Sequence, residues 1–293
     1  MNMVMNTECL LCHLERNVEL ARTLGDEAKA MAFAKELMKL HLNAPENVSS
    51  PHFATGTEAL LRKFYGVAED RYLLEKQESN RFVLERMDKL RALAAAQADP
   101  VLAGLKFAIL GNYIDFSALR GNVSFSVLEE MIATALEMEL DEKVYEKLRA
   151  DLRKAKRLLY VTDNAGEIGF DRICAEMLAE HFPGLQITFC VRGGPAMNDA
   201  TREDAAAVGI GFPVIDNGTC IPGTELASVN AETRQAFRDS DVILSKGMGN
   251  VETLLGCGYN VYYAFLVKCR RFVSRFQKPL MTPMLVRELD ERE

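Results

Sequence analysis

The chain has 293 residues, of which 48% are hydrophobic and 26% are charged, and its formal net charge at pH 7 is −7. These values are typical of a soluble globular protein with one large domain or two medium ones. The acidic balance and the lack of a long basic block argue against nucleic-acid binding, which needs a basic face. No apolar run reaches the roughly 18 residues that a membrane-spanning helix requires, and the first residues lack the pattern of a signal peptide. We therefore expect a cytoplasmic protein without a membrane partner.

The first 155 residues predict helices almost throughout. Apolar residues recur every three or four positions from about 7 to 41 and again from about 55 to 98, with a polar stretch at 70–78 that favours a turn. Two prolines, two asparagines and two serines in residues 43–51 break the pattern between these blocks. Further helices are expected from Pro100 to about 111, at 124–139 and at 141–154. Residues 1–155 are therefore predicted to form a helical domain.

The pattern changes after residue 155, where short apolar runs alternate with helical patterns. The runs lie at 158–161, 186–191, 213–215, 242–244 and 260–267. Strands that alternate with helices indicate βαβ units and a mostly parallel sheet. We therefore expect residues 156–293 to form a Rossmann-like domain with five or six strands. The predicted fold class is α/β, with a helical N-terminal region before an α/β/α sandwich.

The first polar motif, Asp163-Asn-Ala-Gly-Glu167, stands between the first of these strands and a helix. Ligands of open α/β sheets bind outside the carboxyl ends of the strands. The oxygens of Asp163 and Asn164 suit hard divalent cations, and the N-terminus of the following helix attracts an anion such as phosphate. The motif thus predicts a site for a metal and a phosphate. The alternative is an aspartate that only caps an ordinary helix.

Two further motifs follow the second and fourth predicted strands. Asn198 and Asp199 come after the second strand, where Asp199 could give the same cation a second carboxylate; the alternative is a loop and N-cap pair. Lys246-Gly-Met-Gly-Asn-Val-Glu252 follows the fourth, and Lys246 could meet a phosphate as a point charge. The alternative for this motif is a glycine turn with a solvated lysine. Because all three motifs lie on one sheet edge, they favour a shared site.

Two other polar motifs lie in the helical half. Gly111-Asn-Tyr-Ile-Asp115 ends a predicted helix, and its Asn112 and Asp115 could fold over the cleft. Cys9-Leu-Leu-Cys12-His13 could bind a soft metal or form a redox pair, which would make the chain a non-catalytic metal-binding module. The alternative is two cysteines on one helical turn that pack on the core.

Together, the motifs Asp163 to Glu167, Asn198-Asp199, Lys246 to Glu252 and Gly111 to Asp115 resemble the DUF89 family of metal-dependent damage-control phosphatases. This family is also described as acidic-residue-methyltransferase-like, and the early CxxC and short length resemble its compact prokaryotic members. Motif order and the helical region before an α/β region also match, over nearly the whole chain. One departure is Met248, where the family often has glutamine.

The resemblance implies a phosphatase that acts on small phosphorylated metabolites, such as sugar phosphates or damaged cofactor intermediates. It implies one divalent metal, Mn²⁺, Co²⁺, Ni²⁺ or Mg²⁺, held by Asp163, Asn164 and Asp199. The family's phosphate-contacting lysine maps onto Lys246, and further motif positions fall on Glu167, Asn198, Asn250 and Glu252. Substrate specificity is expected from loops near Asn112 and Asp115.

The expected mechanism is in-line displacement at phosphorus with metal assistance. A polarised water is the preferred nucleophile, with Glu167 or Asp199 as the proton acceptor. An aspartyl-phosphate on Asp163 is the alternative route. An S-adenosylmethionine-dependent carboxyl methyltransferase also remains open, although the first loop has one glycine and no GxGxG pattern. The sequence leaves the oligomeric state undetermined.

Overall fold

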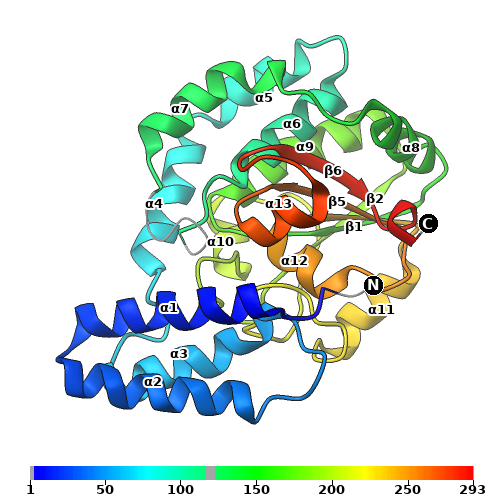
Figure 1. Cartoon of the computed structure of the whole chain (residues 1–293). Coiled ribbons are helices and arrows are strands. Elements are labelled where there is room, and N and C mark those ends of the chain that lie inside the picture. The colour runs from blue at the N-terminus through cyan, green and yellow to red at the C-terminus, as the bar shows by residue number, and fades with distance from the viewer. Residues whose placement is uncertain (1–2, 117–122, 293) are drawn as a thin grey trace.

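The computed structural model describes residues 3–116 and 123–292 (Figure 1). The helices in this part of the chain are α1 (Thr7–Leu24), α2 (Glu27–Leu42), α3 (Ala54–Tyr65), α4 (Leu73–Leu84), α5 (Met87–Ala95), α6 (Pro100–Gly111), α7 (Phe125–Thr134), α8 (Glu142–Leu152), α9 (Glu167–His181), α10 (Arg202–Ala207), α11 (Ala231–Asp239), α12 (Gly247–Leu254) and α13 (Arg270–Phe276). Short 3-10 turns are η1 (Ser50–Phe53), η2 (Ala135–Glu137) and η3 (Asp290–Arg292). None of the described helices is long and apolar enough to cross a membrane.

The predicted helical blocks are divided by local capping signals. The first block breaks at Gly25, and the Asp26 side chain then accepts a hydrogen bond from the Lys29 backbone amide and caps α2. The second block is three helices, because Gly66 ends α3 with a left-handed φ of 66°. The chain then runs through a non-helical connection before α4. The predicted turn at 70–78 therefore corresponds to the connection just before α4 and to its first turn.

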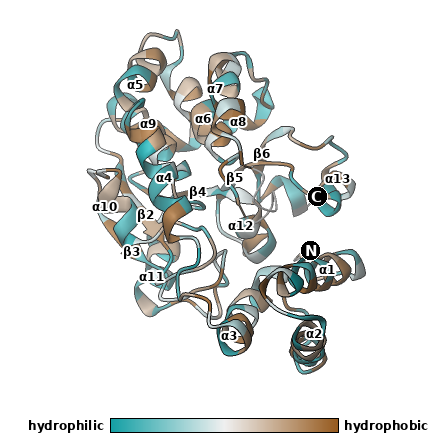
Figure 2. Ribbon diagram, turned by 90° about the vertical axis from the view of Figure 1, so that its left-hand side faces the viewer, coloured by the Kyte–Doolittle hydropathy of each residue, from teal (hydrophilic) through white to brown (hydrophobic). Residues whose placement is uncertain are grey.

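Helices α1, α2 and α3 form a separate helical unit beside the rest of the molecule, here called the α1–α3 group (Figures 1 and 2). Its buried centre is small and consists of Ala21, Ala30, Phe33, Leu37 and Leu61. Large apolar side chains such as Leu42, which is 82% exposed, remain on its surface. This group thus has a small core of its own.

A six-stranded sheet organises the second half, as the alternating pattern predicts. Its strands are β1 (Arg157–Val161), β2 (Gln186–Val191), β3 (Val214–Asp216), β4 (Val242–Lys246), β5 (Val261–Leu266) and β6 (Pro283–Arg287). The order is β3-β2-β1-β4-β5-β6, in which the first five strands are parallel and β6 is antiparallel to β5. The run at 283–287 was not among the predicted strands, since its apolar stretch is short and precedes a charged tail.

Both faces of the sheet are covered, so the chain is a mostly parallel α/β protein with helices on either side. Leu158 and Tyr160 of β1 point into one hydrophobic core, whereas Leu159 and Val161 point into the other. This alternation follows from the two-residue period of a strand. The α12 helix packs on the second face through Val251.

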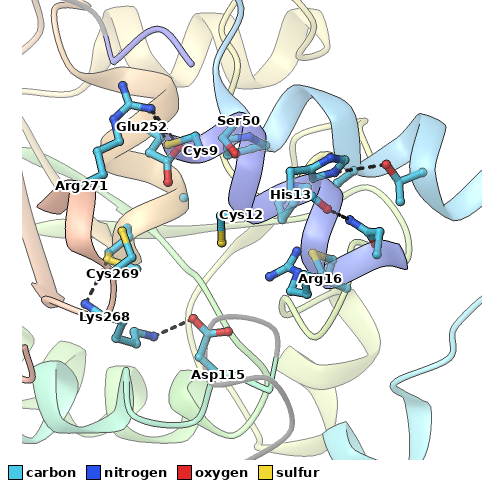
Figure 3. Close-up of a pocket in the computed structure, with 18 of the residues that line it drawn as sticks. Cys9, Cys12, His13, Arg16, Ser50, Asp115, Glu252, Lys268, Cys269 and Arg271 are labelled. Atoms are coloured by element: carbon cyan, nitrogen blue, oxygen red, sulfur yellow. Dashed lines mark hydrogen bonds and ion pairs between the residues drawn. The ribbon is translucent and has the colours of Figure 1, made fainter. Parts of the chain in front are cut away.

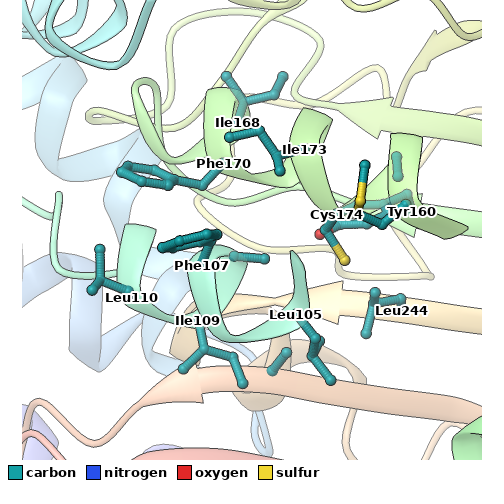
Figure 4. Close-up of a cluster of buried hydrophobic side chains, with 14 of the residues drawn as sticks. Leu105, Phe107, Ile109, Leu110, Tyr160, Ile168, Phe170, Ile173, Cys174 and Leu244 are labelled. Carbon is teal, nitrogen blue, oxygen red and sulfur yellow. The ribbon is translucent and has the colours of Figure 1, made fainter. Parts of the chain in front are cut away.

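The larger core joins the helical half to the sheet (Figure 4). Helix α6 packs against α9, and a Cβ on Gly111 would lie 2.8 Å from the Phe170 ring. Glycine therefore permits the close approach of these two helices. The same core contains Leu105 from α6, Leu148 from α8 and Leu244 from β4. The predicted domain boundary between residues 155 and 156 stays a prediction. Side chains from both sides of this boundary pack in one hydrophobic core.

Candidate active site

The loops after β1 and β4 meet at one point of the sheet edge. β1 and β4 are neighbours at the place where the strand order reverses direction, and such switch points form the ligand crevice of open α/β sheets. A Cβ on Gly247 would lie only 1.8 Å from the Oδ2 atom of Asp163. The two loops are therefore in direct contact and share one site.

The loop after β1 is held by the helical half of the chain. Asp163 Oδ2 accepts hydrogen bonds from Asn112 Nδ2 at 3.0 Å and from Asn164 Nδ2 at 2.8 Å. The Gly166 amide donates to Asn80 Oδ1 on α4 at 2.7 Å, and its φ of 76° turns the chain into α9. Helices from the first 155 residues thus fix the position of this motif.

The loop after β2 joins the same site. Asn164 and Asp199 form an isolated β-bridge, and the Ala200 amide donates to the Asp163 carbonyl oxygen at 2.7 Å. The Asn198 amide donates from Nδ2 to Asn164 Oδ1 at 2.8 Å, while Asn198 Oδ1 is buried without a hydrogen-bond donor among the described residues. The structure therefore brings together the predicted residues Asp163, Asn164, Asn198 and Asp199.

Arg192 supports the two acidic side chains from behind. It is fully buried, and its Nε donates to Asp199 Oδ2 at 2.6 Å, while its Nη2 lies 3.8 Å from Asp163 Oδ1. A buried guanidinium is a fixed, permanently charged donor. Sequence reasoning did not assign Arg192, although it directly follows β2 as the other site residues follow their strands.

Several carboxyl groups are linked in this cluster. The linked carboxyl groups of the described residues belong to Asp115, Asp163, Glu167, Asp171 and Asp199, and the paired cations are Arg192, Lys246 and Lys268. Burial and the neighbouring carboxylates of Asp199 and Glu167 raise the pKa of Asp163 well above its usual range. Burial also raises the pKa of Asp199 to about 6, against the opposing effect of Arg192.

Lys246 does not face the cavity, contrary to the role expected from the sequence. Its side chain is wholly buried, and its Nζ lies 2.7 Å from Glu167 Oε1 and 2.9 Å from Asp171 Oδ1. It also donates to the Ala108 carbonyl oxygen at 2.7 Å. Burial lowers its pKa, but the two carboxylates outweigh this effect and raise the pKa above its usual value. In this geometry Lys246 is a buried ion-pair partner under the site.

Glu167 is enclosed by the same network. Its Oε1 accepts from Lys246, and its Oε2 accepts from Asn112 Nδ2 at 2.9 Å and Asn164 Nδ2 at 2.8 Å. The residue has no exposed surface. Glu167 therefore holds the surrounding side chains in place and does not border the cavity.

Lys268 is a second lysine at the site, and although its side chain has no exposed surface, the residue is part of the cavity lining. It follows the end of β5, lines the cavity and lies with its Nζ 2.6 Å from Asp115 Oδ2. It also donates to the Asn112 carbonyl oxygen. Sequence reasoning missed Lys268, although the signal was the same as for Lys246, a lysine directly after an apolar strand.

Asn112 and Asp115 both lie at the site, but Asn112 is buried beneath it and Asp115 borders the cavity. Asn112 is fully buried and connects Asp163 and Glu167 to the Leu266 amide, which donates to Asn112 Oδ1 at 3.0 Å. Asp115 borders the cavity next to Lys268. The structure thus brings both residues of the helical half to the sheet edge, and of the two only Asp115 borders the cavity.

Asn250 and Glu252 lie on α12 and separate into two roles. Asn250 is fully buried; its Nδ2 donates to the carbonyl oxygens of Thr162 and Lys246, and its Oδ1 accepts from Thr224 Oγ1 at 2.8 Å. It therefore ties the β1 loop to the β4 loop. Glu252 instead lines the cavity.

A cavity of about 790 Å³ opens over these loops (Figure 3). Asp163, Asn164 and Asp199 lie in its wall, together with Asp115 and Lys268. The opposite wall comes from α1 and includes Cys9, Cys12, His13 and Arg16. This volume is that of a site for a small molecule.

The CxxC-His motif does not form a metal centre in the described part of the chain. His13 uses both ring nitrogens within the α1–α3 group, at 3.0 Å from His41 Nε2 and 3.2 Å from Thr57 Oγ1. No group of three His, Cys, Asp or Glu side chains in residues 3–116 and 123–292 is arranged to hold an ion. The alternative of core packing is also wrong, because Cys12 is exposed and Cys9 is partly exposed at the cavity.

The fold and site define an α/β protein with a small-molecule cavity over acidic loops at the topological switch point. Residues 5–282 match the family model described as the damage-control phosphatase ARMT1-like domain. The chain belongs to this family, in agreement with the resemblance in its motifs.

Similar proteins cover nearly the whole chain. A damage-control phosphatase of Pyrococcus horikoshii is 33% identical over 286 residues, covering 93% of this chain and 94% of the relative. A damage-control phosphatase of Archaeoglobus fulgidus is 29% identical, covering 84% of this chain and 85% of the relative. The crystal structure of a DUF89 family protein from P. horikoshii matches with a TM-score of 0.82 and 27% identity, covering 98% of this chain and 99% of that one.

Proposed function

We propose that the chain is a divalent-metal-dependent phosphatase that hydrolyses small phosphorylated metabolites, such as sugar phosphates. The observation that carries this proposal is the convergence of Asp163, Asn164 and Asp199 with Lys268 around one cavity. The names of the relatives from P. horikoshii and A. fulgidus support a phosphatase reaction.

The residues present fit a divalent cation through two carboxylates and amide oxygens, and not through a group of three His, Cys, Asp or Glu side chains, which the described residues do not form. Asp163 and Asp199 stand side by side against Arg192, and the buried Asn198 Oδ1 has no hydrogen-bond donor among the described residues. Two carboxylates and an amide oxygen are ligands that Mg²⁺ and Mn²⁺ accept. Asp163, Asn164 and Asp199 would hold the ion. When bound, it supplies Lewis-acid polarisation and charge neutralisation to phosphoryl transfer.

The other residues position the substrate and move protons. The Lys268 ammonium binds a phosphate oxygen at the cavity wall, in the role that the sequence had placed on Lys246. Asp199 has Oδ2 committed to Arg192, so its Oδ1 is the oxygen that would face the ion and the attacking water. Glu167, the other predicted acceptor, has both oxygens bonded within the protein. An aspartyl-phosphate on Asp163 is tested by trapping a phosphorylated protein from labelled substrate.

The test is release of phosphate from para-nitrophenyl phosphate and a sugar-phosphate panel by metal-stripped protein. Mg²⁺, Mn²⁺, Co²⁺, Ni²⁺ and Zn²⁺ are added back singly, and strong turnover is expected with one or more of Mn²⁺, Co²⁺ and Ni²⁺. Full turnover without metal would contradict the role of the ion. No phosphate release from any substrate with any metal would contradict the phosphatase reaction. Carboxyl methylation from S-adenosylmethionine would then support the alternative enzyme.

Asp163→Ala tests the site itself. The variant lacks one ligand of the ion, and the charge neutralisation that a bound ion gives the transition state is worth several kcal/mol. We therefore expect turnover to fall by about a thousandfold and Mn²⁺ binding to be lost in calorimetry. Asp88→Ala is the matched control, because the Asp88 side chain is 99% exposed on α5. Full metal-dependent turnover by Asp163→Ala would refute this assignment.

A further inference from the structure

Cys9 and Cys12 of the CxxC motif both line the cavity from α1, and the proposed reaction gives neither of them a role. Both thiols are free; Cys12 is exposed and Cys9 is partly exposed. Figure 3 shows Cys12 pointing from α1 toward Lys268 and Asp115, with Cys9 beside Arg271. Thiols react with reagents from solvent only where they are accessible. The pair is therefore accessible to small molecules that enter the cavity.

The spacing of the two cysteines brings them within reach of one another. Residues three apart in an α-helix have Cα atoms about 5 Å apart, inside the range of about 4.4–6.8 Å that disulfides span. Their Cβ atoms are about 5–6 Å apart, whereas a disulfide needs about 3.8 Å, so the backbone has to tighten locally. Cys9 permits this because it lies in the first turn of α1, where its amide donates to Asn6 Oδ1 and not to a helical carbonyl oxygen. The distortion therefore falls on the end of the helix.

The surroundings of the two sulfurs assign them different roles. Burial raises the pKa of the Cys9 thiol, and the hydrogen bond that Arg271 Nη1 donates to Cys9 Sγ at 3.2 Å opposes this effect. The exposed Cys12 thiol is therefore the first to meet a reagent from solvent, and Cys9 attacks second. The Arg271 guanidinium stabilises the Cys9 thiolate as its negative charge forms.

We propose that Cys9 and Cys12 form a redox-active dithiol that closes to a disulfide by exchange with low-molecular-weight disulfides such as oxidised glutathione. The Cys12 thiolate attacks one sulfur of the reagent, which forms a mixed disulfide on Cys12 and releases one glutathione thiolate. The Cys9 thiolate then attacks Cys12 Sγ, which forms the Cys9–Cys12 bond and releases the second glutathione thiolate. The two released thiolates take up the two protons of the protein thiols, so the protein is oxidised by two electrons and the reagent is reduced.

The second step clears the cavity of the first adduct. A glutathionyl group on Cys12 would lie inside the cavity, across from Asp163 and Asp199, whereas the Cys9–Cys12 bond adds no atoms to it. The bond also draws Cys9 toward Cys12 and away from the Arg271 guanidinium that contacts it in the reduced protein. The dithiol thus limits how long an adduct can block the cavity. This inference goes beyond the proposed function and does not depend on a phosphatase reaction.

The test is incubation of the full chain in buffers with stepped ratios of reduced to oxidised glutathione, followed by acid quenching and mass spectrometry of the intact protein and its peptides. We expect the parent to lose two hydrogen atoms, with Cys9 joined to Cys12, and to regain them with dithiothreitol. Cys9→Ser and Cys9→Ala lack the second thiol. The mixed disulfide on Cys12 should therefore accumulate in both at least about tenfold more than in the parent, because intramolecular attack no longer removes it.

Cys269→Ser is the matched control, because Cys269 also lines the cavity but stands before α13, outside the CxxC motif. This variant should form the Cys9–Cys12 bond as the parent does, and Cys12→Ser should leave Cys9 largely reduced. A bond between Cys9 and Cys269 in the parent, or equal accumulation of the mixed disulfide in the parent and in Cys9→Ser, would overturn the proposal. So would a parent that stays reduced at every ratio, or a Cys9 that reacts as fast without Cys12 as with it.

Discussion

The two walls of the cavity are built in different ways. On the sheet side, the loops after β1, β2 and β4 are held by buried hydrogen bonds and ion pairs, and even the backbone of Asp163 is tied to Ala200. On the other side, the α1–α3 group has a small core, and Leu11, which is 67% exposed, borders the cavity. The contrast indicates that the acidic loops are fixed before a ligand binds, whereas the far wall has fewer constraints.

Contacts of several kinds join the far wall to the body of the described chain. Met3 is buried in the second core, Arg271 donates to Val4 and Cys9, and His52 lies 3.3 Å from Glu225. Catalysis needs side chains held to within a fraction of an ångström, while specificity depends on the shape of the outer cavity. The sheet wall therefore suits the reaction, and the far wall suits the choice of substrate.

The largest loss of stability is expected from Lys246→Met, because this lysine of the sheet wall is fully buried. The variant leaves Glu167 and Asp171 without their shared cation, and the loss of one partner from a buried ion pair costs about 3–5 kcal/mol. Urea denaturation should show this loss of unfolding free energy. A lysine that contacts phosphate would instead lose turnover and keep its stability.

Lys147→Met is the control for the loss of a lysine charge. Lys147 pairs with Asp290 at 2.8 Å, but its side chain is 48% exposed, so the expected loss is below about 1 kcal/mol. If the two variants were equally stable, the buried network would not stabilise the sheet wall.

A smaller effect, on turnover, is expected for Gly247→Ala. The new Cβ would lie 1.8 Å from Asp163 Oδ2, and the φ of 77° adds backbone strain. Displacement of Asp163 by such a contact should lower metal-dependent turnover about a hundredfold. Gly66→Ala is the control, because Gly66 has a similar φ of 66° and a Cβ there would meet no described atom within 4 Å. Equal turnover in both variants would show that turnover does not depend on the position of the Asp163 side chain.

The sequence predicted the fold and the acidic part of the site because both depend on local patterns. Alternating apolar runs give a parallel sheet, and Asp163 and Asp199 lie in the loops after its first two strands. Contacts between residues far apart in the chain could not be predicted from these local patterns. Lys246 ends β4 and Lys268 follows β5. Contacts with α6 and α9 bury Lys246 against Ala108 and Glu167, whereas Lys268 pairs with Asp115 and belongs to the cavity lining.

The same limit applies to the CxxC-His motif. Its spacing indicates possible ligands, but spacing cannot tell that His13 turns toward His41 and Thr57. Nor could the sequence show that Asn80, far from the site in the chain, accepts the Gly166 amide. Residues that position a motif from another helix carry no local signal.

The smallest expected effect is a change in the pH dependence of stability, and it comes from His13 on the far wall. Burial, followed by the charges of Arg16 and His41, lowers the pKa of His13 to about 3. Thr57 Oγ1 donates its proton to the Phe53 carbonyl oxygen, so it accepts from His13 Nε2. His13 Nδ1 is then the acceptor for His41 Nε2. A second proton on Nδ1 would break that bond, which explains why the folded state keeps His13 neutral.

This arrangement makes the stability of the far wall depend on pH. In the unfolded chain His13 binds a proton near pH 6.5, whereas in the folded chain it does so only near pH 3. The unfolded state therefore binds more protons between these values, and stability that is complete above pH 6.5 falls as the pH decreases. At pH 5 the loss from His13 is about 2 kcal/mol. His13→Gln removes this titration, so the difference in unfolding free energy between pH 7.5 and pH 5 should shrink by about that amount. An identical pH dependence in the parent and in His13→Gln would mean that His13 is already protonated in the fold, and that the α1–α3 group is looser than its contacts indicate.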